Sequence, residues 1–252
     1  MKTYKGIDVS KWQGSPDFSK VRDAGYSFVM VKASQGGSRD YPFPFKDPQF
    51  DNNMLQLEQT PGELYVGTYH FMIAQTAKQA KKEAEFYIST IRPYADAIQL
   101  WAAVDLELDT LNVDRQTYTA AVKTFTDEVR AAGFRPMIYS QYWYLNAYLE
   151  ALPENVPLWI CDINTTTWPE GAQLWQLGQC AVPGIDGACD INAGKAIMGD
   201  VNRDGRVNAR DVTAMMRYIV TGSPNIDLKQ ADFDRDGKIT ARDVTALMKA
   251  VK

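Results

Sequence analysis

The chain has 252 residues, a net charge of −4 at pH 7 and an ordinary apolar content of 45%. This length accommodates one large domain, or a large domain and a small one, with a substantial core. The weak negative charge and the lack of a basic cluster argue against nucleic acid as a partner. No run of about 18 apolar residues is present, so we expect no transmembrane helix and no membrane insertion.

The first residues enter a strand-like pattern directly and lack the apolar segment of a signal peptide. The expectation is either a chain that is not exported or one whose signal has been removed. Three cysteines are present, Cys161, Cys180 and Cys189, and an odd number is a poor disulfide framework. Cys180 and Cys189 flank a Pro-Gly loop, so a disulfide between them and two buried free thiols are both open alternatives.

Strand-like and helix-like segments alternate five times in the first 150 residues. The expected strands lie at 4–9, 26–32, 64–71, 99–108 and 135–139. The helices that follow them are expected at 16–24, 47–57, 80–91, from the cap at 114 to the stop at 133, and at 142–149. Three closely spaced strands then come without helices, at 156–162, 172–176 and 188–191.

Alternation of strands and helices predicts a parallel sheet, and eight strands suggest a closed barrel. The expected fold is therefore α/β: an irregular TIM-like (β/α)5(β)3 barrel. In such barrels the reactive groups lie at the carboxyl ends of the strands. The polar residues at those ends are Asp8, Lys32, His70, Asp105, Glu107, Asp162 and Asp190.

Asp105 and Glu107 are separated by one residue at the end of an apolar strand. Side chains alternate along a strand, so both point the same way, with Cα atoms roughly 6.6 Å apart. Like charges at that distance repel, and burial raises the pKa of at least one. A protonated carboxyl beside a carboxylate is what glycoside cleavage requires. Two exposed acids at a strand end are the alternative, and the other strand-end acids weigh against it.

A series of short motifs in register across residues 4 to about 195 resembles the muramidases of glycoside hydrolase family 25, the Chalaropsis-type lysozymes. The residues that carry the resemblance are Gly6–Ser10, Trp12–Gly14, Phe28–Gly36, Gly67–Phe71, Asp105–Glu107, Ile138–Ser140, Leu158–Ile160, Leu174–Gln176 and Asp190–Asn192. The family's fold, a barrel of five βα units and three further strands, matches the expected element order.

The resemblance implies that Glu107 is the general acid that protonates the glycosidic oxygen, and that Asp105 stabilises positive charge at the sugar. In one proposal for the family, the substrate's N-acetyl group attacks while a carboxylate orients it. Asp8 and Asp190 correspond to two further acids of the catalytic cleft. The implied substrate-binding residues are Tyr69, Tyr139, Trp159, Trp175 and Lys32. Lys32 either neutralises the acid cluster or caps its strand, and no cofactor is needed for catalysis.

Two strand-end residues stand apart from this pattern. Asp162 follows Cys161 where the family usually has a small residue and then a polar or aromatic one, which leaves the sugar subsite and the exact glycan open. His70 is the only histidine, and nothing in the sequence supports a metal site or a Ser–His pair for it.

From residue 200 the composition changes and a repeat appears, because residues 200–217 recur as 232–249. Each copy begins with a twelve-residue loop whose oxygen-bearing side chains and Gly are spaced to wrap one calcium ion. Two structural calcium ions are therefore expected. The ligands are Asp200, Asn202, Asp204, Arg206, Asn208 and Asp211, then Asp232, Asp234, Asp236, Lys238, Thr240 and Asp243, with Arg206 and Lys238 contributing backbone carbonyls.

EF-hands normally have Glu at loop position 12, whereas this chain has Asp211 and Asp243, and no long helix precedes the first loop. Duplicated loop-then-helix units of this kind resemble dockerin modules, small all-α domains of cellulosomal enzymes that bind cohesin domains. The resemblance implies that the partner contacts include Ala209, Arg210, Ala241 and Arg242. Near-identity of the two halves suggests two-fold pseudo-symmetry, and hence two binding orientations.

The expected organisation is a catalytic barrel at 1–197 and a dockerin at 198–252. The expected function is a secreted, extracellular peptidoglycan hydrolase that cleaves the β-1,4 bond between N-acetylmuramic acid and N-acetylglucosamine. Its dockerin would bind a cohesin on a scaffold or cell-surface protein. The alternatives are an inactive glycan-binding module, and a glycosidase acting on chitin or another N-acetylated glycan.

Overall fold

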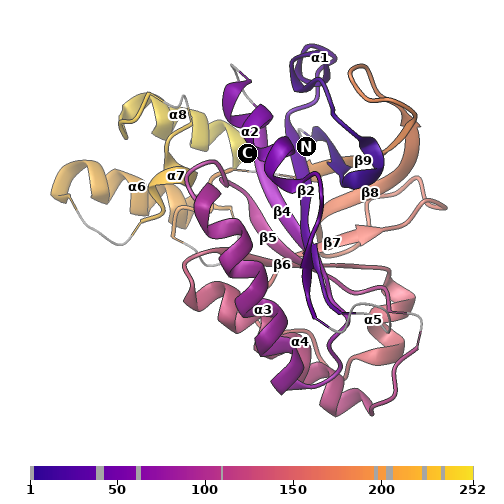
Figure 1. Cartoon of the computed structure of the whole chain (residues 1–252). Coiled ribbons are helices and arrows are strands. Elements are labelled where there is room, and N and C mark those ends of the chain that lie inside the picture. The colour runs from indigo at the N-terminus through magenta and orange to yellow at the C-terminus, as the bar shows by residue number, and fades with distance from the viewer. Residues whose placement is uncertain are drawn as a thin grey trace. The chain divides into compact units, whose positions relative to one another are not determined.

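The protein is described from a computed structural model, in which residues 3–37, 43–60, 64–108, 110–195, 198–202, 207–222, 226–233 and 236–251 are placed (Figure 1). The chain divides into two compact units. One comprises Lys5–Ala193, and the other comprises Gly194–Lys252 with Met1–Tyr4. Each unit is described separately below.

The larger unit alternates strands and helices as far as residue 148, after which only strands follow. The strands are β1 Thr3–Val9, β2 Phe28–Gln35, β3 Phe45–Lys46, β4 Tyr65–Phe71, β5 Trp101–Asp105, β6 Arg135–Ser140, β7 Leu158–Cys161, β8 Ala172–Ala181 and β9 Ala188–Lys195. The helices are α1 Phe18–Asp23, α2 Phe50–Gln59, α3 Ala77–Ile91, α4 Arg115–Ala131 and α5 Tyr142–Tyr148, with short 3-10 turns at Lys11–Gln13 and Arg92–Tyr94.

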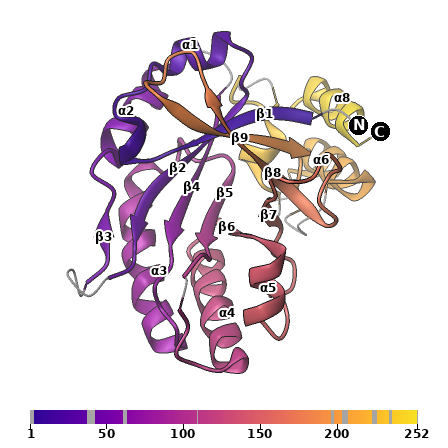
Figure 2. The same ribbon diagram turned by 90° about the vertical axis from the view of Figure 1, so that its right-hand side faces the viewer.

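The sheet closes into an eight-stranded barrel because β1 pairs with β2 on one side and with β9 on the other (Figure 2). The strand order is β1-β9-β8-β7-β6-β5-β4-β2, and the two-residue β3 is added antiparallel at the end of β2. The pairs β1–β2, β2–β4, β4–β5, β5–β6, β6–β7 and β7–β8 are all parallel. The predicted mixed α/β barrel is thereby confirmed, and parallel closure brings the carboxyl ends of its strands together.

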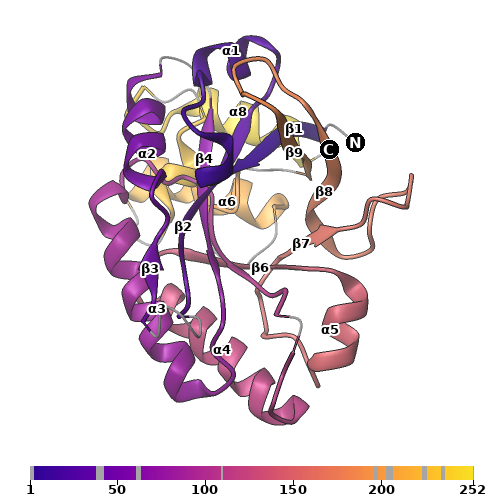
Figure 3. The same ribbon diagram turned by 45° about the vertical axis from the view of Figure 1, so that its right-hand side comes forward.

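Helices α3 and α4 pack against each other and cover one side of the barrel (Figure 3). The buried positions of α3 recur at helical spacing, so one apolar stripe faces the sheet. Tyr87 of α3 and Phe125 of α4 stack with ring centroids 5.8 Å apart in the core between them. Asp114 caps α4 as predicted, accepting a 2.7 Å hydrogen bond from the backbone of Thr117.

Strand β2 continues three residues past its expected end at 32. Its extension to Gln35 pairs with both β3 and β4, with a register shift between Lys32 and Ser34. Pairing on both sides satisfies backbone groups that a loop would leave to solvent, so residues 33–35 remain in the strand. Strands β8 and β9 are also longer than expected, because they are neighbours in the sheet and extend each other's ladder.

The smaller unit contains α6 Ala209–Thr221, α7 Leu228–Ala231 and α8 Ala241–Ala250. Asn208 caps α6 and Thr240 caps α8, and each forms a capping box with the Asp three residues further on. The unit has an apolar core of its own, formed by Val201, Met215, Ile226, Ala231, Val244 and Leu247. Asp204, Arg206 and Asp234, three of the predicted calcium ligands, lie outside the described residues.

All three cysteines are free thiols. The structure therefore has no disulfide between Cys180 and Cys189. Cys189 is completely buried, while Cys161 and Cys180 are half-buried. Among the described residues, no helix combines the length and apolar character that crossing a bilayer requires.

Candidate active site

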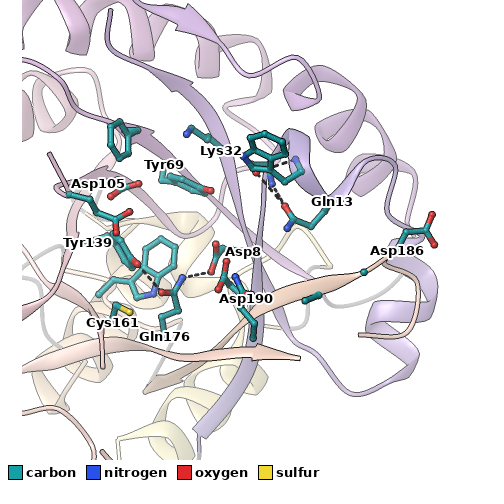
Figure 4. A pocket seen from close by; sticks show the side chains of 18 residues that line it. Asp8, Gln13, Lys32, Tyr69, Asp105, Tyr139, Cys161, Gln176, Asp186 and Asp190 are labelled. Carbon is teal, nitrogen blue, oxygen red and sulfur yellow. Dashed lines mark hydrogen bonds between the residues drawn. The ribbon is translucent and has the colours of Figure 1, made fainter. Parts of the chain in front are cut away.

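A pocket of about 650 Å³ opens where the barrel strands end (Figure 4). It is lined from both halves of the barrel, from β1 to β9. Its lining consists of Asp8, Ser10, Trp12, Gln13, Lys32, Tyr69, Phe71, Asp105, Glu107, Tyr139, Trp159, Cys161, Gln176, Gln179, Asp186, Gly187, Ala188 and Asp190. The four predicted catalytic acids are therefore all in one cavity, although up to 182 positions separate them in the sequence (190 − 8).

Asp105 and Glu107 differ sharply in their surroundings. Asp105 is the last residue of β5 and is 4% exposed, whereas Glu107 lies beyond the strand and is exposed. Burial raises the pKa of Asp105 well above its ordinary value, and the charge of Glu107 and a hydrogen bond with it add to the rise. A hydrogen bond between two carboxyls requires one proton, so the pair holds a single proton that either group can carry.

Asp8 and Asp190 face each other across the β1–β9 side of the pocket (Figure 4). Asp8 is 6% exposed, and Oδ2 accepts hydrogen bonds from the side-chain amides of Gln176 at 3.0 Å and Asn192 at 2.8 Å. Burial, followed by repulsion from Asp190, raises the pKa of Asp8 to about 7 despite these two donors. The pKa of Asp190 is raised by burial as well, and a hydrogen bond from Gln179 opposes that rise.

Three aromatic side chains form a wall of the pocket. Trp159 is 1% exposed and packs edge-on against Tyr139, with centroids 4.5 Å apart, and against Tyr69 at 5.9 Å. The Tyr139 hydroxyl donates to Gln176 Oε1 at 2.7 Å, and Trp159 Nε1 donates to Asn192 Oδ1 at 2.8 Å. The same two amides that bind Asp8 thus also hold two of the aromatic rings, so wall and acid are positioned together.

Lys32 is the one cation among the described residues that line the pocket, which also has five carboxylates. Burial lowers its pKa, while the charges of Asp105 and Asp47 oppose that change. Its Nζ lies 5.1 Å from the ring centroid of Phe71. Lys32 therefore lies in the same pocket as the acids.

Three strand-end residues considered from the sequence lie elsewhere. Trp175 is 8% exposed, packs on Trp168, and donates to the Asp162 carbonyl at 2.8 Å, because strand alternation places it on the face of β8 opposite Gln176. Asp162 accepts a hydrogen bond from the backbone of Asn164 and so closes a turn. Neither Trp175 nor Asp162 lines the pocket.

His70 is also outside the pocket, in a buried polar chain. Its Nδ1 is 2.8 Å from Ser34 Oγ, and its Nε2 is 3.1 Å from a Glu83 carboxylate oxygen. All three side chains are buried, and burial lowers the pKa of His70 although Glu83 acts to raise it. The arrangement joins β2 and β4 to α3, and a group enclosed in this way has no access to a substrate.

Sequence reasoning assigned no role to Gln176 and Asn192, which organise the pocket, or to Trp12 and Gln13 at its rim. Trp12 is 78% exposed, on the loop that follows Asp8. The sequence motifs could have indicated these residues. Gln176 and Asn192 lie in the motifs that contain Trp175 and Asp190, and Trp12 and Gln13 directly follow the motif that contains Asp8. Their function depends on hydrogen bonds between distant strands, which spacing along the chain does not reveal.

In the smaller unit, both loop-ending aspartates are buried and complete the capping boxes of α6 and α8. Asp211 accepts from the backbone of Asn202 and of Asn208, and Asp243 accepts from the backbone of Phe233 and Thr240. One carboxylate oxygen of Asp232, Oδ1, is buried with no hydrogen-bond partner. A buried carboxylate oxygen without a partner is what a hard cation would satisfy, so the donor set fits calcium.

The described residues hold no ready-made group of three or more His, Cys, Asp or Glu side chains around a metal position. The predicted partner-binding residues Ala209, Arg210, Ala241 and Arg242 all lie exposed at the starts of α6 and α8. Further along, Met216 and Met248 occupy equivalent places and are 54% and 49% exposed. The duplicated sequence thus presents two similar exposed helix faces.

Comparison with known proteins gives relatives for the larger unit. The autolytic lysozyme of Clostridium acetobutylicum is 26% identical over 193 residues, which are 75% of this chain and 55% of that protein. The N,O-diacetylmuramidase of Chalaropsis is 28% identical over 146 residues, 55% of this chain and 66% of that protein. The chain thus spans only about half to two thirds of these relatives' length.

The fold is also that of a solved structure, the modular autolysin LytC from Streptococcus pneumoniae in complex with a synthetic peptidoglycan ligand. The TM-score is 0.65 at 21% identity, over 76% of this chain and 46% of LytC. Residues 7–180 match the model of the glycosyl hydrolases family 25, and residues 198–252 match that of the dockerin type I domain. The chain is therefore a member of glycosyl hydrolase family 25 that carries a type I dockerin domain.

Proposed function

We propose that the barrel is a muramidase that cleaves the β-1,4 bond between N-acetylmuramic acid and N-acetylglucosamine in peptidoglycan. The observation that carries the proposal is the pairing of a buried Asp105 with an exposed Glu107 in a pocket large enough for sugar rings. Two further carboxyls, Asp8 and Asp190, complete the site. The named relatives, a lysozyme and a diacetylmuramidase, favour peptidoglycan as the substrate.

In this mechanism the hydrogen-bonded pair holds one proton. Glu107, the exposed member, delivers that proton to the glycosidic oxygen, and Asp105 is then the ionised partner. Asp105 supplies the compensating negative charge as the bond breaks and positive charge develops at the sugar. Asp105 acts either on that charge directly or by orienting the substrate's N-acetyl group. Burial strengthens both effects, since the interaction of charges is screened less in a desolvated pocket.

The rest of the pocket would bind the glycan. The faces and edges of Tyr69, Tyr139 and Trp159 suit the apolar sides of sugar rings. Asp8 and Asp190 would accept hydrogen bonds from sugar hydroxyl or amide groups. An inactive binding module would not need four carboxyls in one cavity, and Asp162, which left the glycan open, lies outside the pocket.

We further propose that the dockerin binds two calcium ions and anchors the enzyme to a cohesin domain. The support is the duplicated loop, the buried unpartnered oxygen of Asp232 and the match to the dockerin type I model. The exposed starts of α6 and α8 would be two equivalent recognition faces that allow two orientations. Anchoring to a scaffold or cell-surface protein implies a secreted, extracellular enzyme.

The first prediction concerns the proton donor. Glu107→Gln keeps the shape of the side chain but removes the proton, so clearing of a turbid cell-wall suspension should slow by about 10²–10⁴-fold. The wild-type protein should release fragments with new reducing ends. Wild-type binding without such release would favour a glycan-binding module, and cleavage of chitin oligomers but not of cell walls would favour the other glycosidase.

The second prediction concerns Asp8 and pH. A carboxyl whose pKa is raised on folding stabilises the protein fully below its unfolded value of 3.8, and this contribution is lost as pH rises through about 7. Between pH 4 and 7 the free energy of unfolding should therefore fall by about 3 kcal/mol more in the wild type than in Asp8→Asn. Calorimetric unfolding of both proteins across this range measures the difference, and parallel pH curves would refute it.

The third prediction concerns calcium. Because metal binding and folding are coupled in small metal-binding domains, chelation should lower the helical circular dichroism and abolish binding to a cohesin. Cell-wall clearing should stay within two-fold of its original rate, since the barrel site uses no metal in this mechanism. Binding of a cohesin at full affinity in excess chelator would contradict the proposal.

The fourth prediction concerns the two recognition faces. If either face can bind, Arg210→Ala or Arg242→Ala alone should change cohesin affinity only slightly, while the double variant should lose binding strongly. Titration calorimetry of the three variants in calcium would distinguish the cases. A large and equal loss from each single substitution would mean that both faces are needed together.

A further inference from the structure

Glu107, the proposed proton donor, lies two residues beyond the end of β5, where the strand ladder no longer holds the backbone. It is also exposed, and its carboxyl has a hydrogen bond with Asp105, but burial does not fix the backbone that carries it. A proton donor needs a defined position, because a misplacement of about 1 Å can cost roughly 100-fold in rate. Some other part of the structure must therefore hold this segment.

We infer that Ser140 and Tyr144 are positioning residues that clamp the backbone on both sides of Glu107 and so aim its carboxyl at the glycosidic oxygen. The inference rests on the proposed function, which makes Glu107 the proton donor. Neither residue lines the pocket, and each acts only through the backbone of the residues next to Glu107.

The clamp on the N-terminal side holds Leu106. Its backbone N–H donates to the carbonyl of Tyr139 at 2.9 Å, and its carbonyl accepts from Ser140 Oγ at 2.7 Å. Leu106 and Ser140 are both completely buried. A buried side chain with both backbone groups bonded leaves the residue before Glu107 one conformation.

The clamp on the C-terminal side holds Leu108 through two tyrosines. The Tyr144 hydroxyl donates to the Leu108 carbonyl at 3.2 Å, and it lies 3.2 Å from the hydroxyl of Tyr118. A phenol has one proton, so while Tyr144 donates to Leu108 it must accept from Tyr118. The order of donation is therefore Tyr118 to Tyr144 to the carbonyl of Leu108.

The two tyrosines are fixed by the helices that carry them. Tyr118 lies on α4 and Tyr144 on α5, both are at most 2% exposed, and their rings are packed with centroids 6.5 Å apart. Helices α4 and α5 lie side by side (Figure 2). The clamp thus ties the segment that carries Glu107 to the outer helices on one side, while Ser140 of β6 holds it on the other.

The alternative is that these two tyrosines only contribute to core packing. Replacing each tyrosine by phenylalanine distinguishes positioning from packing, since the ring and its packing stay and only the hydroxyl is lost. Tyr148 offers a matched control because its ring lies 4.6 Å from that of Tyr144 on the same helix, while its hydroxyl has no part in the clamp.

The experiment measures kcat, KM and pH profiles of the full chain with calcium on purified cell walls, for Tyr144→Phe, Tyr118→Phe, Tyr148→Phe and Glu107→Gln. Tyr144→Phe should lower kcat at least ten-fold with KM within two-fold, and Tyr118→Phe should have a smaller effect in the same direction. Tyr148→Phe should match the wild type. The alkaline limb of the pH profile of Tyr144→Phe should move to lower pH, because a Glu107 displaced from Asp105 loses the like-charge repulsion that favours its protonated form.

The outcomes separate the two hypotheses. If Glu107→Gln is inactive while Tyr144→Phe keeps the wild-type kcat and pH profile, Tyr144 does not position Glu107, and the proposed function stands. If Glu107→Gln retains activity, the assignment of Glu107 as the proton donor is wrong, and with it the proposed function. If Tyr144→Phe does not fold, Ser140→Ala tests the other side of the clamp with the same readouts, and wild-type values there would overturn the inference.

Discussion

The pocket depends on carboxyl groups that are kept together away from water. Four of them converge at one end of the barrel, and their mutual repulsion and burial would expel them unless other groups held them. Gln176 and Asn192 do this for Asp8, since their amides donate to it while their oxygens accept from Tyr139 and Trp159. Acid, amide and aromatic wall therefore form one network, and loss of any member would disturb the others.

The Asp105–Glu107 pair shows how a strand end can divide one chemical task. The strand carries Asp105 into the desolvated interior, where burial and the neighbouring charge of Glu107 raise its pKa, so the pair retains one proton. Two residues later the chain has left the ladder, and Glu107 is exposed to whatever enters the pocket. Burial of one acid and exposure of the next follow from where β5 ends, and hydrogen bonds from β6 and α5 fix the segment beyond it.

The dockerin unit uses the same aspartates for two purposes. Asp211 and Asp243 occupy the last position of each predicted calcium loop and also complete the capping boxes of α6 and α8. A cation bound by either carboxylate would thus be linked directly to the start of a helix. Because Arg210 and Arg242 stand at those helix starts, the metal and the proposed recognition face are coupled through one side chain in each half.

The sequence by itself determined the element order, the barrel and the repeat, because periodicity is a local property of the chain. It also singled out four acids that lie in one pocket, although Glu107 lies beyond β5 and Asp190 lies near the start of β9. Only the tertiary structure decided which acid is buried, that Trp175 faces away from the pocket, and that Gln176 and Asn192 link Asp8 to the aromatic wall. It also decided that β2 extends past its expected end, through pairing with β3. These features arise from contacts between strands and helices that are distant in sequence, where desolvation and hydrogen-bond geometry, rather than local pattern, set the outcome.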